Sequence, residues 1–417
     1  MQKDDLLRLM HDPSLLPPER QTLLTNIAAQ AAALNMPCYL VGGFVRDLML
    51  NKPVNDLDIV LEGDAIKLGR SLVKKFGGKL TPHDKFQTAI WSLPEPLNLQ
   101  AATLDLITAR KETYEDPGAL PTVVAATIED DLRRRDFAIN AMAIRIDGDH
   151  FGELLDPLNG QADLKKRIIR VLHPRSFIDD PTRIFRAIRY EGRYSFNLDF
   201  ETLNLIGPEA LAVISQLSGE RIRHELDLIF EEQGANQMIL RVASLGILNA
   251  IHVELLPLNL SYANLLERDL PVDIPGSRTT LGYILWFMDL SEDGILSIAK
   301  RLDFTSDMTY SVWAAAQVKK SLPVLVNSKP SEWTAALEKF PPISIYVAYL
   351  VSHENALLDY LSMWRHVKPH TTGDDLKARG LQPGPRYGEI LSLLRTAWLD
   401  GDVKDQGQEN EFLDTLL

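Results

Sequence analysis

The pattern of hydrophobic and polar positions predicts a mixed first part of the chain and a helical second part. The run at 38–41 is apolar and predicts a buried strand, and a turn at Gly42 and Gly43 follows it. A helical pattern continues to Leu50, and a second apolar run, which ends at Val60, predicts another strand. This stretch is therefore expected to form strand, turn, helix and strand.

Further patterned segments place this unit in an α+β fold. Short strands separated by proline-containing loops are expected at 79–80, 88–93 and 102–108. Helices are expected at 17–36 and 65–76 and, in the second half, at 238–248, 280–290 and 308–321. The second half is thus expected to be all-helical.

Two aspartates, Asp56 and Asp58, stand at alternate positions of the second strand. Side chains two apart on a strand point to the same face, so the two carboxylates would share one small volume. Like charges at that spacing persist where a cation neutralises them, and carboxylate oxygens suit Mg²⁺ better than zinc. The pair predicts a magnesium site; the alternative is a solvated edge strand.

The glycine pair ahead of the helix predicts a phosphate-binding turn. Gly42 and Gly43 leave room for a phosphate to approach the backbone, and the helix that follows adds partial positive charge at its N-terminus. Together with the two aspartates, this turn predicts a triphosphate bound with magnesium.

A later stretch combines an acid with a series of arginines. Asp180 followed by Pro181 marks a helix start, and four arginines then fall along one broad face: Arg183, Arg186, Arg189 and Arg193. Such a face suits an anionic ligand, whereas the alternative for Asp180 alone is to cap the helix N-terminus.

Composition bounds the class of protein. The chain has 417 residues, enough for two to four domains, and a net charge of −13, which argues against a non-specific nucleic-acid binder. The charge is uneven, because 165–193 holds nine basic and three acidic residues, whereas 397–417 holds six acids and one lysine. A phosphate-binding surface is therefore expected in the middle of the chain.

The expected location is the cytoplasm. No apolar run approaches the length needed to span a bilayer, and the N-terminus, with Asp4 and Asp5, does not resemble a signal peptide. The single cysteine, Cys38, excludes an internal disulfide and predicts no disulfide-linked partner.

These motifs resemble a known family. Gly42-Gly43-x-Val45-Arg46-Asp47 followed by Asp56-x-Asp58 resembles the first motif of class II tRNA nucleotidyltransferases, which comprise the CCA-adding enzymes and the bacterial poly(A) polymerases. Residues 130–143, 155–164, 179–183 and 220–226 resemble its later motifs in the same order. The resemblance implies that the first of these packs an apolar helix behind its charged head, after Asp136. The resemblance covers about residues 38–230.

The resemblance implies a fold and a domain order. The fold would be a polymerase β-like nucleotidyltransferase palm with a small mixed sheet, followed by an all-helical neck, body and tail. The N-terminal helix and catalytic head would occupy 1–148, the neck 149–235, the RNA-binding body 236–330 and the tRNA-binding tail 331–417.

The resemblance also implies roles for single residues. Asp56 and Asp58 would hold Mg²⁺ and act in catalysis with Asp105, for which a strand-end acid without a metal is the alternative. Arg110 would open a mobile loop, reaching Pro121, that switches the pocket from C to A addition, unless the segment is a plain linker. The implied nucleotide-binding residues are Gly42, Gly43, Arg46, Arg134, Arg135, Asp136, Asn140, Asp180, Arg183, Arg186 and Arg189.

Base selection can be argued from donors and acceptors. Cytosine and adenine each present an amino donor beside a ring-nitrogen acceptor, whereas uracil and guanine present a carbonyl beside an N–H donor. An ionised aspartate accepts and an arginine donates, so Asp180 and Arg183 would fit the first two bases. No nucleic-acid template would then be required.

The implied activity is template-independent addition of C, C and A to the tRNA 3′ end from CTP and ATP, with release of pyrophosphate. The alternatives are an A-adding or CC-adding tRNA nucleotidyltransferase or a poly(A) polymerase, although the chain lacks the strongly basic C-terminal extension of the latter. A non-catalytic RNA-binding protein would not need the aspartates and the phosphate turn together.

Overall fold

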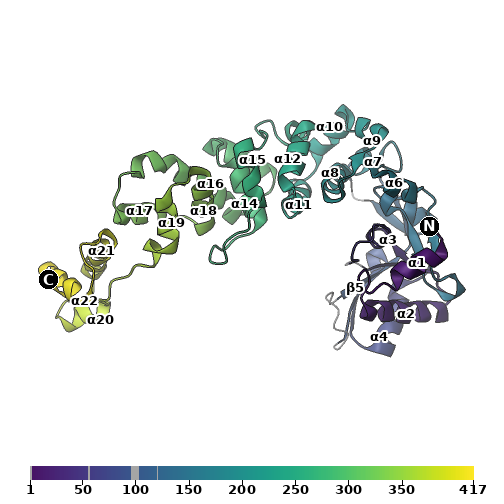
Figure 1. Ribbon diagram of the computed structural model, residues 1–417, viewed down its shortest axis with the longest axis horizontal. Coiled ribbons are helices and arrows are strands. Elements are labelled where there is room, and N and C mark those ends of the chain that lie inside the picture. Colours follow the sequence, from purple (N-terminus) through teal and green to yellow (C-terminus); the bar gives the residue numbers. More distant parts are fainter. Residues whose placement is uncertain (1, 55–56, 95–102, 120) are drawn as a thin grey trace. The chain divides into compact units, whose positions relative to one another are not determined.

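The computed structural model describes residues 2–54, 57–94, 103–119 and 121–417 (Figure 1). The chain divides into two compact units, Met1–Leu217 and Ser218–Leu417. This division falls inside the neck expected at 149–235, and the four-part domain scheme stays a prediction. No helix in the described ranges is long and apolar enough to cross a membrane.

The first unit is built on a mixed sheet. Its described strands have the order β3-β4-β5-β2-β1-β8-β9, in which β2 and β5 are parallel and the other neighbouring pairs are antiparallel. The strands are β1 Cys38–Val41, β2 Asp58–Leu61, β3 Lys79–His83, β4 Thr88–Ser92, β5 Thr103–Thr108, β8 Ala143–Arg145 and β9 Glu153–Leu155. The predicted α+β class is confirmed.

Both faces of this sheet are covered. Helices α2, Pro18–Ala33, and α4, Ala65–Phe76, contact each other and strands of the sheet, as Figure 1 shows. On the other face, Tyr39, Val41 and Val60 pack with Leu132 of α5, Ile128–Arg133. Alternate strand residues share a face, so Asp58 points to the same side as Val60. The sheet thus directs Asp58 toward α5.

Two segments differ from the sequence-based expectation. Residues 110–113 form strand β6, Arg110–Thr113, which pairs with β7, Thr122–Ala125, in a two-stranded ribbon. The expected mobile loop is wrong for these residues, because backbone pairing between β6 and β7 satisfies their hydrogen bonds.

The apolar helix expected after Asp136 is also wrong. The chain makes a 3₁₀ turn, η2 Ala138–Asn140, and then strand β8. Strand β8 pairs with β1, where Leu40 faces Ile144, and the pairing satisfies the backbone groups along that edge of β1. Tertiary pairing therefore overrides the local helical pattern here.

The rest of the first unit is mainly helical. It also contains two short strands, β10 and β11, which pair in parallel. The remaining elements of the first unit are α1 Lys3–Met10, α3 Gly43–Met49, η1 Asp84–Phe86, η3 Gly148–His150, α6 Gly160–Lys166, β10 Ile168–Ile169, α7 Ser176–Asp179, α8 Thr182–Tyr194, β11 Asn197–Leu198, α9 Phe200–Asn204 and α10 Pro208–Gln216.

The second unit is helical throughout its assigned elements, as predicted. Aromatic rings form part of its core: the ring of Tyr283 lies 4.9 Å from that of Phe230 and 4.7 Å from that of Phe304. The elements are α11 Gly219–Phe230, α12 Ala235–Ser244, α13 Ile247–Ile251, η4 Leu260–Glu267, α14 Arg278–Phe287, α15 Glu292–Arg301, α16 Ser306–Leu325, α17 Pro330–Leu337, α18 Pro342–Ser352, α19 Asn355–Ser362, η5 Trp364–His366, α20 Gly373–Ala378, α21 Pro385–Asp400 and α22 Gln406–Leu416.

Candidate active site

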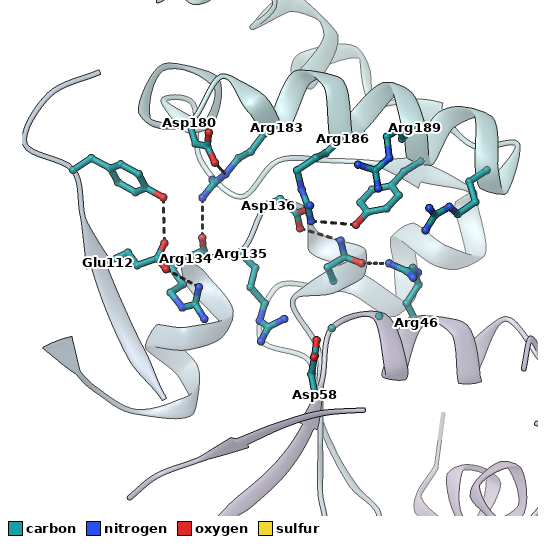
Figure 2. Close-up of a pocket in the computed structure, with 16 residues that line it drawn as sticks. Arg46, Asp58, Glu112, Arg134, Arg135, Asp136, Asp180, Arg183, Arg186 and Arg189 are labelled. Carbon is teal, nitrogen blue, oxygen red and sulfur yellow. Dashed lines mark hydrogen bonds and ion pairs between the residues drawn. The ribbon is translucent and has the colours of Figure 1, made fainter. Parts of the chain in front are cut away.

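A polar cavity of about 450 Å³ lies in the first unit, between the sheet and α8. Figure 2 shows the arginines of α8 along one side and Asp58 on the other. Seven arginines and four acids line it, so its surface carries an excess of positive charge. The lining residues are Gly42, Gly43, Arg46, Asp58, Glu112, Tyr114, Arg134, Arg135, Asp136, Asn140, Asp180, Arg183, Arg186, Arg189, Tyr190 and Arg193.

The cavity collects the nucleotide-binding residues expected from the sequence. All eleven of them line it, together with Asp58. Asp105 and Arg110 are not among the described lining residues, and Asp56 lies outside the described part of the chain. The roles of these residues in binding and catalysis stay predictions.

The glycine turn joins β1 to α3 at the floor of the cavity. Gly42 has φ +64°, a conformation that favours glycine, and a Cβ built on it would lie 2.6 Å from Nη1 of Arg135. Any larger residue at this position would strain the backbone and displace an arginine. The glycine therefore keeps the approach to the cavity open.

The described carboxylates fit a hard cation. Asp58, half-buried at the start of β2, stands in direct register with Asp105, which is exposed on the parallel neighbour β5. Residues paired this way point to the same face, so their oxygens can approach one ion. Oxygen donors of this kind suit Mg²⁺. No cluster of three or more potential metal ligands occurs among the described residues.

A hydrogen-bond chain crosses the cavity from α3 to α8. Arg46 donates through Nη1 to Oδ1 of Asn140 at 2.6 Å, and Nδ2 of Asn140 donates to Asp136 at 2.9 Å. Arg186 donates to the same carboxylate through Nε and Nη2, at 2.9 and 2.6 Å. This series of hydrogen bonds fixes the orientation of two arginines that line the cavity, Arg46 and Arg186.

The buried carboxylate in this chain, Asp136, stays ionised. Burial raises the pKa of Asp136, but the Arg186 charge and the hydrogen bonds from Asn140 and Arg186 outweigh it, and the pKa lies below its usual value. Arg46 also donates from Nε and Nη2 to Asp47, both at 2.9 Å, in a bidentate pair.

A second carboxylate, Asp131, holds the two arginines at the C-terminal end of α5. Its Oδ1 accepts from Nη2 of Arg134 at 2.7 Å, and its Oδ2 accepts from Nη2 of Arg135 at 3.0 Å. Asp131 is fully buried. Burial raises its pKa, but the charges of Arg135 and Arg134 lower the pKa by more, so that it lies below the usual value for an aspartate. Both arginines are thereby set toward the cavity.

The ribbon meets α5 through Glu112 of β6. Its Oε1 accepts from Arg134 at 2.8 Å and from Arg110 at 3.1 Å, and its Oε2 accepts from the hydroxyl of Tyr114 at 3.1 Å. Arg110 therefore contacts a cavity residue without lining the cavity. These contacts tie the ribbon to the cavity wall.

Asp180 and Arg183 stand at the start of α8. Oδ1 of Asp180 accepts from the backbone N–H of Thr182 at 3.2 Å and from its hydroxyl at 2.7 Å, while the residue at the N-cap position of α8 is Pro181. Arg183 donates to Ser176 Oγ at 2.8 Å and to the carbonyl of Arg134 at 2.9 Å. Nε of Arg183 lies 4.0 Å from Oδ2 of Asp180. Both side chains line the cavity.

Sequence reasoning missed four residues of this site: Glu112, Tyr114, Asp131 and Tyr190. Glu112 lies in β6 and Tyr114 directly follows it, and their spacing of two signals a shared face only once the segment is a strand. Tyr190 lies one residue beyond Arg189 on a helix already marked as functional, and the guanidinium of Arg46 lies 5.3 Å from its ring.

The first unit thus sets a mixed sheet and an arginine-lined cavity against helix α8. A model of the poly A polymerase head domain matches residues 38–170. An A-adding tRNA nucleotidyltransferase of Halalkalibacterium halodurans is 32% identical over 98% of this chain and 95% of its own length. The chain belongs to the tRNA nucleotidyltransferase family.

Other relatives in this family differ in length and activity. An A-adding tRNA nucleotidyltransferase of Geobacter sulfurreducens is 32% identical over 94% of this chain, which spans 47% of that relative. A CC-adding tRNA nucleotidyltransferase of the same organism is 28% identical, over 93% of this chain and 94% of its own length. The chain thus spans about half of one A-adding relative and nearly all of another.

Solved structures of CCA-adding enzymes have the same fold. One apo form is 30% identical with a TM-score of 0.84, covering 100% of this chain and 99% of that one. A Thermotoga maritima CCA-adding enzyme complexed with tRNA is 29% identical with a TM-score of 0.78, covering 99% and 98%. A complex with ATP is 28% identical with a TM-score of 0.80, covering 100% and 97%.

Proposed function

We propose that this protein adds C, C and A to the 3′ end of tRNA, using CTP and ATP and releasing pyrophosphate, in the cytoplasm. The observation that carries the proposal is that all eleven expected nucleotide-binding residues line one cavity together with Asp58. An arginine-rich cavity suits a triphosphate, and solved CCA-adding relatives bind tRNA and ATP.

The glycine turn and Arg46 would receive the triphosphate. Arg46 is held from two sides, by Asp47 and by Asn140, so its guanidinium needs little reordering when an anion binds. Gly43 begins α3, and the closest atom to a Cβ built there would be Nη2 of Arg46 at 3.4 Å. Phosphate oxygens would therefore meet a preset arginine beside an open backbone.

The carboxylates of β2 and β5 would hold the metal. Asp58 and Asp105 are the described candidates, with Asp56 as the third expected from the sequence. A magnesium ion held by these carboxylates would supply Lewis-acid chemistry, favouring loss of the proton from the attacking 3′-hydroxyl and offsetting negative charge on the departing pyrophosphate. The protein side chains orient the primer and the triphosphate for in-line attack on the α-phosphate.

Asp180 and Arg183 would read the edge of the base. Arg183 is fixed by Ser176 and by the carbonyl of Arg134, so its guanidinium keeps one orientation while nucleotides exchange. An acceptor and a donor at this spacing match the edges of cytosine and adenine. This pair would replace a nucleic-acid template.

A-only addition is the second candidate, and the A-adding relatives that match nearly the whole chain favour it. Both candidates add the last A, so the cavity alone does not separate them. The difference lies in whether the same pocket also accepts CTP on a tRNA that lacks CCA.

One experiment separates the candidates. Purified protein with Mg²⁺ receives either tRNA lacking CCA or tRNA ending in CC, with CTP alone, ATP alone or both, and product length is measured. Full CCA addition extends the first tRNA with CTP and completes it with both nucleotides. An A-only enzyme extends only the tRNA that ends in CC, and it does so with ATP. A poly(A) polymerase makes long tails from ATP. No extension of any tRNA, with Asp58→Ala as the inactive reference, would refute the proposal.

A further inference from the structure

The cavity holds two tyrosines with different surroundings. Tyr190 is enclosed: the guanidinium carbons of Arg46 and Arg186 lie 5.3 and 5.7 Å from its ring, and the ring of Phe137 meets it edge-on at 5.7 Å. Tyr114 also lines the cavity, but no ring or cation contact to its own ring is found among the described residues. Its ring is therefore available to a ligand in the cavity.

The segment around Tyr114 is fixed at both ends. Before it, Glu112 is held by Arg134, and the Tyr114 hydroxyl donates to Glu112 at 3.1 Å. After it, the backbone N–H of Gly118 donates to the carbonyl of Ile178 at 3.1 Å, two residues before Asp180. The ring is thus anchored beside the start of α8 by contacts on either side of it.

A continuous chain of contacts links Tyr114 to the base-reading arginine. The Tyr114 hydroxyl bonds to Glu112, Glu112 bonds to the Arg134 side chain, and the carbonyl of Arg134 accepts from Arg183 at 2.9 Å. Burial raises the pKa of the Tyr114 hydroxyl to about 12, with the Glu112 charge adding to the effect, so the hydroxyl stays a donor at neutral pH.

We propose that the ring of Tyr114 is the flat surface on which the base of the incoming nucleotide packs while Asp180 and Arg183 contact its edge. The inference rests on the proposed function, because it takes the cavity to be the nucleotide site. Edge contacts alone leave a base uncovered on its faces, and aromatic rings stack on bases regardless of sequence. Adenine offers the larger stacking face, so ATP should depend on Tyr114 more than CTP does.

Nucleotide binding without tRNA tests the inference directly. Dissociation constants for ATP and CTP are measured by equilibrium dialysis on the full chain with Mg²⁺, for wild type and four substitutions of Tyr114. Tyr114→Ala and Tyr114→Leu should weaken ATP binding about 5- to 150-fold, the range given by loss of one base–aromatic stack. Tyr114→Phe and Tyr114→Trp keep a ring and should stay within about threefold of wild type, less than the loss of one such stack.

The control lies on the ribbon whose strand β6 ends one residue before Tyr114. Val124 on β7 is 57% exposed and does not line the cavity, so Val124→Ala should bind both nucleotides as wild type does. Far-ultraviolet circular dichroism shows that each variant is folded. Loss of binding in Tyr114→Phe equal to that in Tyr114→Ala would mean that the hydroxyl bond to Glu112 matters and the ring does not.

The outcome also separates the inference from the proposed function. Unchanged ATP binding in both Tyr114→Ala and Tyr114→Leu overturns the stacking role, whatever the transfer assay gives. If wild type binds ATP in a ring-dependent way but extends no tRNA, the base surface stands and the proposed reaction falls. Kinetic data add a check, because loss of stacking should raise the KM for ATP more than it lowers kcat.

Discussion

Replacing Asp136 by asparagine tests the hydrogen-bond network that orients the arginines of the cavity. Asp136 is buried and accepts four hydrogen bonds: two from Arg186, one from Asn140 at 2.9 Å and one from the backbone N–H of Phe137 at 2.8 Å. Asparagine has the same shape but no charge. Its NH₂ group is itself a donor and would face the N–H donors that now bond to the carboxylate. The substitution should therefore loosen η2 and α8 and reduce nucleotidyl transfer.

The magnitude follows from the exposure of the partner. Hydrogen bonds to charged groups contribute about 1.5–3 kcal/mol, and breaking a fully buried ion pair costs about 3–5 kcal/mol. The Arg186 side chain is 35% exposed, so water replaces part of what it loses. We expect Asp136→Asn to lower the free energy of local opening by about 2 kcal/mol at neutral pH.

The pH dependence has a definite sign. Burial raises the pKa of Asp136, the Arg186 charge and hydrogen bonds lower it more, and the folded-state pKa lies below the usual 3.8. A depressed carboxylate pKa contributes stability that is present above the unfolded pKa and lost as pH falls through the folded pKa. The difference between wild type and Asp136→Asn should thus be largest at neutral pH and shrink in acid.

Hydrogen exchange on peptides covering 137–142 and 182–190 measures this opening locally. Glu129→Gln on α5 is the matched control, because Glu129 is exposed and the change is also carboxylate to amide. An opening free energy within about 0.5 kcal/mol of wild type, the usual scatter of surface substitutions, would refute the reasoning.

The other predictions concern chemistry and selectivity. Asp58→Ala and Asp105→Ala should each abolish addition of every nucleotide in the length assay while tRNA binding persists, and C addition within tenfold of wild type would remove that residue from the metal site. Arg110→Ala should keep CC addition and slow the final A, whereas equal loss of both would place Arg110 in the common active site. Asp180→Ala should lose roughly tenfold of the selectivity for CTP and ATP over UTP and GTP, the share of one mismatched group; if selectivity survives while the rate falls, Asp180 acts as the cap of α8.

Local periodicity accounts for what the sequence predicted well. The strand, turn and helix around Gly42 were predictable because an apolar run, a glycine with φ +64° and a short helical pattern each act within a few residues. The arginines of α8 were predictable for the same reason: spacings of three along a helix put Arg183, Arg186 and Arg189 on one face, and all three line the cavity.

The features that local sequence patterns did not predict depend on contacts between segments far apart in the sequence. Glu112 matters because β6 pairs with β7 and presents its carboxylate to Arg134, 22 residues away. Residues 137–143 are apolar enough for a helix, and pairing with β1 makes their end a strand. Local propensity cannot weigh such pairing energies, since they arise only once the sheet assembles.

The position of the buried carboxylates explains how an acidic chain can build a site for anions. The net charge is −13, yet at physiological ionic strength exposed charges are screened beyond about 8 Å, so the chain total says little about a cavity. Asp131 and Asp136 each form ion pairs with arginines that line the cavity, and these pairs fix the direction of the guanidinium groups. Ordered arginines interact with a triphosphate without the reorganisation that flexible ones require. The anion site therefore depends on which carboxylates are buried beside arginines, and a count of charges along the sequence cannot supply that.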